Sequence, residues 1–295
     1  MTRVGIVSKL AVHGDPAVTA REQEPALAIA RDLVPWLAGR GVECLTAASR
    51  PPIPGARPVT DHLFAAEVDL VVVLGGDGTL LAASSLLGDK PIPVLGINLG
   101  RLGFLVAFDP QDARSAVDRA IKGQLKIDER MRLAVSVHRS GKVETQVALN
   151  DAVISQASDA RIIGLSVTLD GTPVAAYRAD GVIVSTPSGS TAYNLAAGGP
   201  ILVPWQAAMA ITPICPHMLT NRPLVVPGDS TVVVRIDGER DARVSIDGYP
   251  AVTLDPGDEV VVRRAAAPLR LYRSDKPHFE ILREKLKWGE HASRA

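Results

Sequence analysis

The sequence predicts an α/β domain with a parallel sheet, then a β-rich, sandwich-like domain, and a C-terminal helix that packs back on one of them. Short apolar strands alternate with helical stretches through the first part of the chain, which is typical of a parallel α/β sheet. From about Met131, short strands alternate with glycine turns, which is typical of an antiparallel sandwich or barrel-like domain. The expected boundaries are residues 1–125, 126–274 and 275–295.

The strands of the first part are short, apolar and β-branched, as buried strands are. They are predicted at Val4–Val7, Val42–Thr46, Leu70–Leu74 and Pro93–Ile97. A helix is predicted over Glu24–Leu37, where apolar residues recur at helical spacing. Pro25 suits the first turn of this helix, whereas Pro35 is expected to bend it or end it early.

A second helix is predicted from Asp109-Pro110, a cap followed by a first-turn proline, to Gly123. Residues 50–58 are rich in proline and are expected to form a surface loop. In a parallel sheet, ligands gather at the carboxyl ends of the strands. The segments that follow the predicted strands are therefore the first places to look for a site.

The second part is predicted to be a run of strands separated by turns such as Ser140-Gly141-Lys142 and Asp170-Gly171. The strands are expected at Leu133–Arg139, Val143–Leu149, Leu165–Leu169, Val174–Tyr177, Val182–Ser185, Val232–Asp237, Arg243–Asp247, Glu259–Arg264 and Leu269–Tyr272. The last segment, Lys276–Trp288, carries apolar residues on one helical stripe, so we expect it to pack against a domain.

Composition limits the class of protein. The 295 residues are 46% hydrophobic and 22% charged, which is ordinary for a globular chain. Lys+Arg and Asp+Glu are equal at 32 each, so global charge indicates neither a nucleic-acid nor a membrane partner. The N-terminus enters a strand without the layout of a signal peptide, and no apolar run approaches the roughly 18 residues of a membrane span. Cys44 and Cys215 form no close metal-type spacing, so we expect a cytoplasmic, reduced protein without zinc.

The first motif is Gly75-Gly76-Asp77-Gly78-Thr79, where an apolar strand stops and helix-compatible residues begin. Glycines let a ligand approach the backbone, and a helix start offers free N–H groups to phosphate. Asp77 would repel an anion, so we expect it to bind a hydroxyl or a metal while the backbone around it holds phosphate. The alternative is a tight turn in which Asp77 only caps the helix.

A second glycine loop follows the next predicted strand, at 96–104. Asn98 can orient a hydroxyl or an amide, and Arg101 can form two hydrogen bonds to a phosphate. The alternative makes Arg101 a solvated loop residue. The two loops predict a set of donor-phosphate contacts at Gly75, Gly76, Thr79, Asn98, Gly100 and Arg101.

The longest motif runs from Asp180 to Pro200, where a strand leads into a hydroxyl-rich turn and then a Gly-Gly-Pro. Hydroxyls and free backbone N–H groups suit phosphate or ribose, and Tyr193 offers a face for a base. Asn150-Asp151 ends another predicted strand and can bind a ribose diol, or it can form an Asx-type turn. Asp247-Gly248-Tyr249 is expected to be a hairpin turn rather than a ligand contact.

Together these motifs closely resemble the NAD kinase family. The resemblance is carried by GGDGT at Gly75–Thr79, NxGxLGFL at Asn98–Leu105 and DGxIxSTPxGSTAYxLxAGGP at Asp180–Pro200. Residues 213–225 and 282–289 also resemble segments of the family. GGDG alone is shared with diacylglycerol and sphingosine kinases and with phosphofructokinases, so the Asp180–Pro200 run is the specific signal.

The resemblance implies phosphorylation of the 2′-hydroxyl of the adenosine ribose of NAD, giving NADP. ATP is the implied phosphoryl donor, with polyphosphate as a second one. The implied fold has an α/β domain and a β-rich domain with NAD in the cleft between them. A divalent cation, Mg²⁺ above all, and a homodimer or homotetramer are also implied. No metal ligand is assigned.

Residue by residue, the resemblance makes Asp77 the general base, and it places Gly78 against NAD. Asn150 and Asp151 match an Asn-Glu pair that binds NAD. The full set implied for NAD is Asp77, Gly78, Asn150, Asp151, Arg161, Arg178, Asp180, Ser188, Gly189, Ser190, Thr191, Ala192 and Tyr193.

The chain departs from the family pattern at three positions. Asp151 replaces a more usual Glu, which shortens the reach of the carboxylate by one methylene. Ser188 replaces Thr and keeps the hydroxyl. Tyr249 stands where many members have Gln, so we expect no amide hydrogen bond at that position.

Two other functions fit part of the sequence. A lipid or sugar kinase would share GGDG, but it is not expected to carry the Asp180–Pro200 run. A non-catalytic dinucleotide sensor would not need Asp77 and both glycine loops. A coupled assay for NADP formation, compared with a diacylglycerol substrate, separates the three functions.

Overall fold

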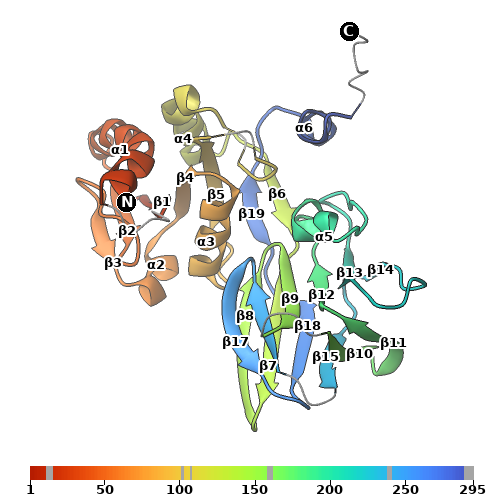
Figure 1. Cartoon of the computed structure of the whole chain (residues 1–295). Coiled ribbons are helices and arrows are strands. Elements are labelled where there is room, and N and C mark those ends of the chain that lie inside the picture. The colour runs from red at the N-terminus through yellow and green to blue at the C-terminus, as the bar shows by residue number, and fades with distance from the viewer. Residues whose placement is uncertain (11–15, 101–102, 107, 158–161, 238–240, 289–295) are drawn as a thin grey trace. The chain divides into compact units, whose positions relative to one another are not determined.

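The computed structural model describes residues 1–10, 16–100, 103–106, 108–157, 162–237 and 241–288. The chain divides into two compact units (Figure 1). One unit combines Met1–Asp128 with Arg270–Ala295, and the other is Glu129–Leu269. No helix among the described residues is both long and apolar enough to cross a membrane.

The first unit is built on a seven-stranded sheet in the order β3-β2-β1-β4-β5-β19-β6. The neighbours from β3 through to β19 are paired in parallel. The strands are β1 Arg3–Ser8, β2 Glu43–Ala47, β3 Arg57–Val59, β4 Leu70–Gly75, β5 Pro93–Asn98, β6 Ile127–Arg130 and β19 Leu269–Tyr272. The predicted parallel α/β sheet is confirmed.

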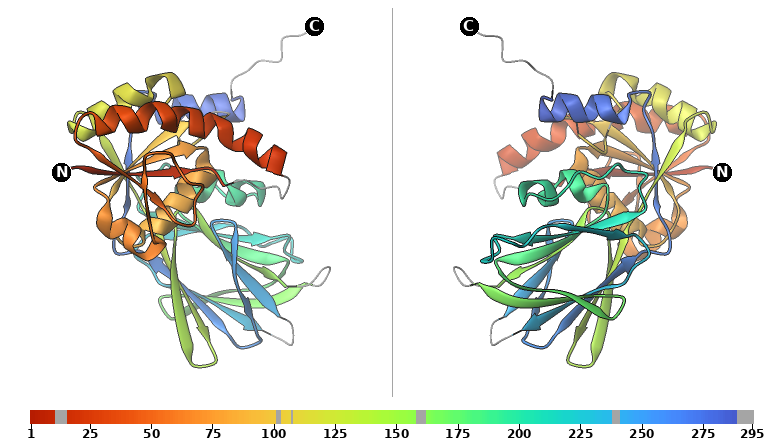
Figure 2. Two further views of the ribbon diagram at one scale, coloured as in Figure 1. Left: turned by 90° about the vertical axis from the view of Figure 1, so that its left-hand side faces the viewer. Right: turned by 90° about the vertical axis from the view of Figure 1, so that its right-hand side faces the viewer.

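Helices cover both faces of this sheet. They are α1 Pro16–Ala38, α2 Asp61–Glu67, α3 Asp77–Leu87, the short 3₁₀ helix η1 Pro110–Asp112, α4 Ala113–Ile121 and α6 His278–Leu286. Figure 2 shows α1 and α4 on one side of the sheet and α2 and α3 on the other. Buried residues of α1 and α4 pack with Val4, Ile6 and Val72 of the strands. Gly5 lies against Phe64, which leaves room for α2 on the opposite face.

Helix α1 differs from the prediction, because it begins at Pro16 and contains both Pro25 and Pro35. The buried stripe that includes Ala26, Ala30 and Leu33 holds the helix on the sheet and outweighs the missing proline N–H groups. The C-terminal segment forms α6, with Ile281 and Leu282 buried, so it packs back as expected.

Strand β19 was expected in the β-rich domain. It instead pairs with β5 in the parallel sheet, so the second unit ends at Leu269. The expected surface loop at 50–58 also ends differently, because Arg57 and Pro58 begin the edge strand β3. Both strands are only three or four residues long, too short for an alternation pattern to reveal their partners.

The second unit is a β-sandwich of two six-stranded sheets. Their orders are β11-β10-β15-β18-β7-β8 and β14-β13-β12-β9-β16-β17, and the pairings are antiparallel. The strands are β7 Leu133–Arg139, β8 Lys142–Ala148, β9 Asp151–Gln156, β10 Ile163–Leu169, β11 Thr172–Ala179, β12 Gly181–Ser185, β13 Ala208–Ile214, β14 Leu224–Pro227, β15 Val232–Asp237, β16 Ala242–Ile246, β17 Tyr249–Leu254 and β18 Glu259–Arg264. The predicted β-rich, sandwich-like domain is confirmed.

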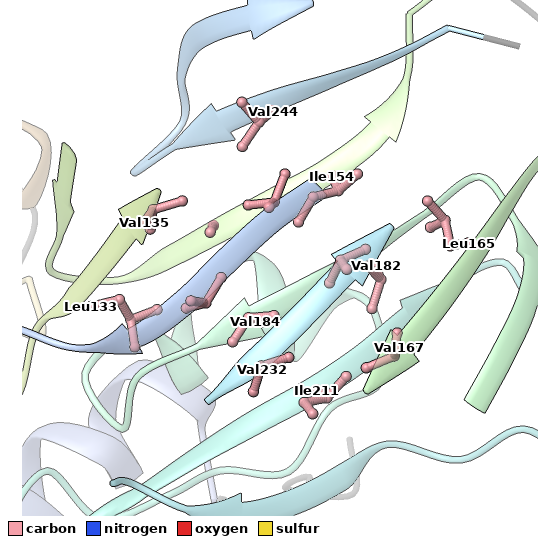
Figure 3. Packing of buried hydrophobic residues seen from close by; sticks show 14 of the residues in the cluster. Leu133, Val135, Ile154, Leu165, Val167, Val182, Val184, Ile211, Val232 and Val244 are labelled. Atoms are coloured by element: carbon pink, nitrogen blue, oxygen red, sulfur yellow. The ribbon is translucent and has the colours of Figure 1, made fainter. Parts of the chain in front are cut away.

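The core of the sandwich is aliphatic and is built from both sheets. Figure 3 shows Leu133 and Val135 of β7 in one cluster with Ile154 of β9 and Val182 and Val184 of β12. All five side chains are fully buried. Removing this apolar surface from water is the main force that holds the two sheets together.

Three hairpins of the sandwich close with two-residue turns. In each turn a non-glycine residue with φ near +50° precedes a glycine with φ of 75–81°, at Ser140-Gly141, Asp170-Gly171 and Asp247-Gly248. Two successive positive φ values match the right-handed twist of the flanking strands, and glycine takes such values without strain. The predicted hairpin turn at Asp247 is confirmed.

Candidate functional site

The GGDG turn joins the end of β4 to the start of α3, and Asp77 is the first residue of that helix. The Asp77 carboxylate accepts three backbone hydrogen bonds from consecutive residues. Phe104 N–H donates to Oδ2 at 2.8 Å, while the N–H groups of Leu105 and Val106 both donate to Oδ1 at 3.1 Å. Asp77 therefore ties the GGDG turn to the second glycine loop.

Two glycines of this region are required by close packing. A Cβ on Gly103 would collide with the Asp77 carboxylate. A Cβ on Gly75 would collide with the side chain of Thr79, which is buried. At Gly76, Gly78 and Gly100 a Cβ would meet open space, so these three leave the backbone accessible.

The second glycine loop is shaped by Asn98, which is buried at the end of β5. Its Oδ1 accepts the N–H of Gly100 at 3.2 Å, and its own N–H donates to the carbonyl of Phe108 at 2.8 Å. Asn98 thus fixes the loop that leads toward the residues bonded to Asp77. Arg101, predicted to bind phosphate, lies outside the described residues.

In the second unit, a turn between β8 and β9 carries Asn150 and leads into Asp151. The Asp247 carboxylate accepts the N–H groups of Leu149 at 2.8 Å, Asn150 at 2.7 Å and Asp151 at 3.1 Å. This repeats the arrangement at Asp77, with one carboxylate on three consecutive backbone N–H groups. The pattern of the sequence did not reveal this role for Asp247, since an Asp before Gly is already explained by the turn.

The hydroxyl-rich segment after β12 is held by its own side chains. Thr186 Oγ1 donates to the carbonyl of Leu149 at 2.6 Å and accepts the N–H of Gly189 at 3.0 Å. Ser190 Oγ donates to the carbonyl of Pro187 at 2.7 Å and accepts the N–H of Leu202 at 3.0 Å. The hydroxyls of Thr186 and Ser190 therefore shape the segment.

Asn194 completes this internal network and is fully buried. Its Nδ2 donates to the carbonyls of Ser190 and Pro200, and its Oδ1 accepts the hydroxyl of Thr212 at 2.7 Å. Gly199 packs directly on Asn194, since a Cβ there would collide with the amide. The Gly-Gly-Pro end of the motif thus serves the packing of the segment.

A cavity of about 350 Å³ opens beside these elements, within the range of small-molecule sites. The predicted site residues that line it are Asn150, Asp151, Ala192 and Tyr193. The residues that the sequence did not single out as ligand contacts are Val153, Ser155, Arg243, Ser245, Asp247 and Gly248. Apart from Ala192 and Tyr193 these come from β9, β16 or the turns beside them, and strand pairing brings them together.

Two buried polar atoms lack a partner in the described structure: Oδ1 of Asn150, a residue that lines the cavity, and Oγ of Ser188. Buried polar groups normally find a hydrogen bond, so such atoms mark places where a ligand can supply one. No donor among the described residues reaches the Asp151 carboxylate, which is 3% exposed. Burial, and then the charge of Asp247, raises the pKa of Asp151 to about 7.

Asp247 is balanced by opposing effects. Burial raises its pKa, while the three backbone N–H groups and the charge of Arg132 act against that rise. Arg132 is 1% exposed, and its Nε donates to the carbonyl of Ala267 at 3.0 Å. The buried Arg132 guanidinium therefore stabilises the charged form of the half-buried Asp247 carboxylate.

The remaining predicted contacts lie apart from the lining of this cavity. Arg178 is exposed on β11, and its carbonyl accepts the N–H of His217. Asp180 is half-buried between β11 and β12, where its N–H donates to the carbonyl of Ile214. Thr191 is half-buried in the short 3₁₀ helix η2, Gly189–Thr191. Arg161 lies outside the described residues.

Two family sequence models match this chain, one on each side of the middle of the sequence. A sequence model of the ATP-NAD kinase N-terminal domain matches residues 38–125, and one of the ATP-NAD kinase C-terminal domain matches residues 149–274. The chain belongs to the NAD kinase family. The resemblance that the motifs carried is confirmed, and the chain is an NAD⁺ kinase, a phosphotransferase.

Relatives in the NAD kinase family match nearly end to end. The NAD kinase of Geotalea daltonii is 42% identical over 290 residues, covering 93% of this chain and 98% of the relative. The NAD kinase of Geobacter sp. strain M21 is 45% identical over 284 residues, with the same coverage.

Solved structures in the family share the fold. The yeast NADH kinase, solved with NADH, has a TM-score of 0.87 at 26% identity and covers 99% of this chain and 89% of its own. An NAD kinase from Archaeoglobus fulgidus, solved with ATP, has a TM-score of 0.74 at 25% identity and covers 97% and 99%.

Proposed function

We propose that the protein transfers the γ-phosphoryl of ATP to the 2′-hydroxyl of the adenosine ribose of NAD, with Asp77 as general base, giving NADP. The observation that carries this proposal is the Asp77 carboxylate, held on three backbone N–H groups at the end of a parallel strand. Family membership supports the reaction class. Polyphosphate is the alternative donor, because its terminal phosphoryl presents the same charges.

The geometry supports Asp77 as the base. A carboxylate has about four lone-pair positions, and three are taken by Phe104, Leu105 and Val106. Among the described residues Oδ2 accepts one hydrogen bond, so it keeps a position for the ribose hydroxyl. As the hydroxyl oxygen bonds to the γ-phosphorus and the bond to the ADP oxygen breaks, the hydroxyl proton passes to Asp77.

The NAD-binding set is proposed as the sequence implied it, with Asn150 and Asp151 as its centre. Asn150 offers an unpartnered buried Oδ1, and Asp151 offers a carboxylate that no described donor reaches. Both suit the hydroxyls or amide of a nucleotide. Tyr193 is 48% exposed and lines the same cavity, so its ring can stack on a base.

The open space at Gly76 and Gly100 supports binding of the donor phosphates by backbone N–H groups. The open space at Gly78 supports its proposed place against NAD. Mg²⁺ in kinases is commonly held by substrate phosphates with one or two carboxylates. We therefore place the divalent cation with the ATP phosphates. A cytoplasmic homodimer or homotetramer completes the proposal, on the strength of the resemblance alone.

A coupled assay tests the reaction. NAD and ATP should give NADP at a rate that depends on both, and polyphosphate should be tried in place of ATP. Binding of NAD without NADP formation would instead favour a dinucleotide sensor. Phosphorylation of a diacylglycerol, with none of NAD, would favour a lipid kinase.

The role of Asp77 is tested by Asp77→Asn. We expect the variant to keep the fold and the affinity for NAD but to lose turnover by about 10²–10⁴-fold, the contribution usual for a general base. Melting temperature and NAD binding should be measured beside kcat, because Asp77 also holds the 104–106 backbone. Near-normal turnover would rule Asp77 out as the base.

A second variant tests placement rather than chemistry. Gly103→Ala keeps the carboxylate but pushes against it, so we expect turnover to fall although Asp77 is present. Gly39→Ala is the matched control, since its Cβ would meet only ordinary contacts at 3.5 Å or more. Equal activity of the two variants would contradict the close packing of Gly103 on Asp77.

A further inference from the structure

Asp247 makes contacts that a turn residue does not need. Its positive φ of 50° and the following Gly248 are sufficient for the hairpin between β16 and β17. Its carboxylate nevertheless turns toward a different connection, the one between β8 and β9, and accepts the N–H groups of Leu149, Asn150 and Asp151. Its own N–H donates to the carbonyl of Asp151 at 3.0 Å.

These bonds fix a piece of backbone that the sheet alone does not hold. Leu149 and Asn150 lie between β8 and β9, so their N–H groups have no place in a strand ladder. Bonds to a charged acceptor are about twice as strong as those between neutral groups. Asp247 thus holds the connection at the point where Asn150 and Asp151 leave it.

The fixed backbone is also the contact point for the hydroxyl-rich segment. The carbonyl of Asn150 accepts the N–H of Thr186 at 2.8 Å, and Ser185 Oγ lies 3.3 Å from the same oxygen. Gly189 packs on this carbonyl so closely that a Cβ would collide with it. A shift of Asn150 would therefore disturb the segment that carries Ser188 and Tyr193.

We propose that Asp247 is a positioning residue of the dinucleotide site, whose carboxylate fixes the Leu149–Asp151 backbone so that Asn150 and Asp151 face the cavity. This inference rests on the proposed NAD kinase function and deepens it. Asp247 acts through its neighbours, and the positive charge of the buried Arg132 stabilises the ionised form of its carboxylate.

The test is Asp247→Asn, which removes the charge and one acceptor oxygen at constant size. We expect the KM for NAD to rise about tenfold, the factor that follows from losing a hydrogen bond to a charged group, while the KM for ATP changes less than twofold. A folded variant with an unchanged KM for NAD would overturn the proposal. A rise of both KM values together would indicate general damage to the structure and would overturn it as well.

The chain offers a matched control in Asp170→Asn. Asp170 and Gly171 form the same turn, with φ values of 49° and 81° against 50° and 81° at Asp247 and Gly248. Within the part of the chain that the structure describes, the Asp170 carboxylate accepts one backbone hydrogen bond, from the N–H of Thr231, and Asp170 lies on the exposed surface. We expect its KM for NAD to equal that of the wild type, and an equal effect of the two substitutions would contradict the positioning role.

A triple variant, compared with its double-variant background, tests whether Asp247 acts through its neighbours. In the background Asn150→Ala with Asp151→Asn, adding Asp247→Asn should raise the KM for NAD less than twofold, because residues that act through one another are not additive. A full tenfold further rise would show that Asp247 acts by another route.

Two measurements on the wild-type protein, amide exchange and NADP formation, separate the remaining outcomes. If Asp247→Asn melts below the assay temperature, amide hydrogen exchange of the wild type decides. Slow exchange at residues 149–151 supports the positioning role of Asp247, and fast exchange overturns it. Absence of NADP formation by the wild type contradicts the proposed function. An active wild type with an unaffected Asp247→Asn contradicts the positioning role alone.

Discussion

At the scale of single residues, the same device occurs twice. Asp77 and Asp247 each place a carboxylate on three consecutive backbone N–H groups, at 104–106 and at 149–151. Three converging N–H groups stabilise a negative charge and orient it. At each place the carboxylate holds a loop that the sequence alone marks only by its glycines or by an Asn-Asp pair.

Asp151 provides a prediction on pH. Burial first, and Asp247 second, raise the pKa of Asp151 from 3.8 to about 7. Between these two pH values the folded protein keeps a proton on Asp151 that the unfolded chain releases. The protonated carboxyl therefore contributes fully to the free energy of unfolding below about pH 4, and this contribution is lost as the pH rises to about 7.

Asp151→Asn removes this titration. We expect the melting temperature of the wild type, relative to this variant, to fall by at least about 5 °C between pH 5 and pH 8. Asp247 and Arg132 remain in both proteins. Asp170→Asn serves as the exposed control, and we expect its melting temperature to depend on pH as that of the wild type does. If the melting temperatures of Asp151→Asn and the wild type change in parallel with pH, the raised pKa of Asp151 is contradicted.

At the scale of elements, packing overrules local preference in helix α1. The helix runs from Pro16 to Ala38 through two prolines, each of which removes a hydrogen-bond donor. Pro35 is exposed, so it contributes little packing to offset this cost. The buried residues around it, among them Leu33 and Leu37, hold the helix on the sheet.

Pro35→Ala should therefore stabilise the protein, by about 1–3 kcal/mol in the free energy of unfolding. Pro54→Ala is the opposite case, because Pro54 and Gly55 occupy the centre of a turn closed by the bond from Ala56 N–H to the Ile53 carbonyl at 3.0 Å. There we expect a loss of up to about 1 kcal/mol. Denaturant unfolding measures the free energy of unfolding of both variants. If Pro35→Ala destabilises the protein, Pro35 does not cost helix α1 stability.

The elements also show how far the sequence could be interpreted. The strands at Leu133–Arg139, Val232–Asp237 and Glu259–Arg264 have the predicted bounds, because alternating apolar residues face a single core. Strands β9 and β13 were missed. β13 is buried at every residue and β9 at four of its six, so neither shows a clear alternation.

At the scale of the whole molecule, the chain leaves its first unit at Asp128 and returns to it at Arg270. The returning strand β19 lies between β5 and β6 in the sheet order. The first unit is therefore incomplete without the end of the chain, whereas the second unit is continuous and has its own core.

Fragments test this organisation. Residues 129–269 should fold alone, with a cooperative thermal transition and the circular dichroism of a β-sandwich. Residues 1–128 should lack such a transition until they are linked to residues 270–288, which supply β19 and α6. Cooperative melting of 1–128 alone would contradict the need for the returning strand.

The sequence by itself determined the fold class, the family and the residues grouped in its motifs. These follow from periodic burial and from glycines beside polar groups, which are local in the chain. The tertiary structure alone decided that β19 belongs to the first sheet and that Asp77 and Asp247 each hold a distant loop. The hydrogen bond from Phe104 to Asp77 spans 27 residues, and that from Asn150 to Asp247 spans 97. Contacts between residues so far apart in the sequence produce no periodic pattern, and each partner already has a local explanation in its own turn.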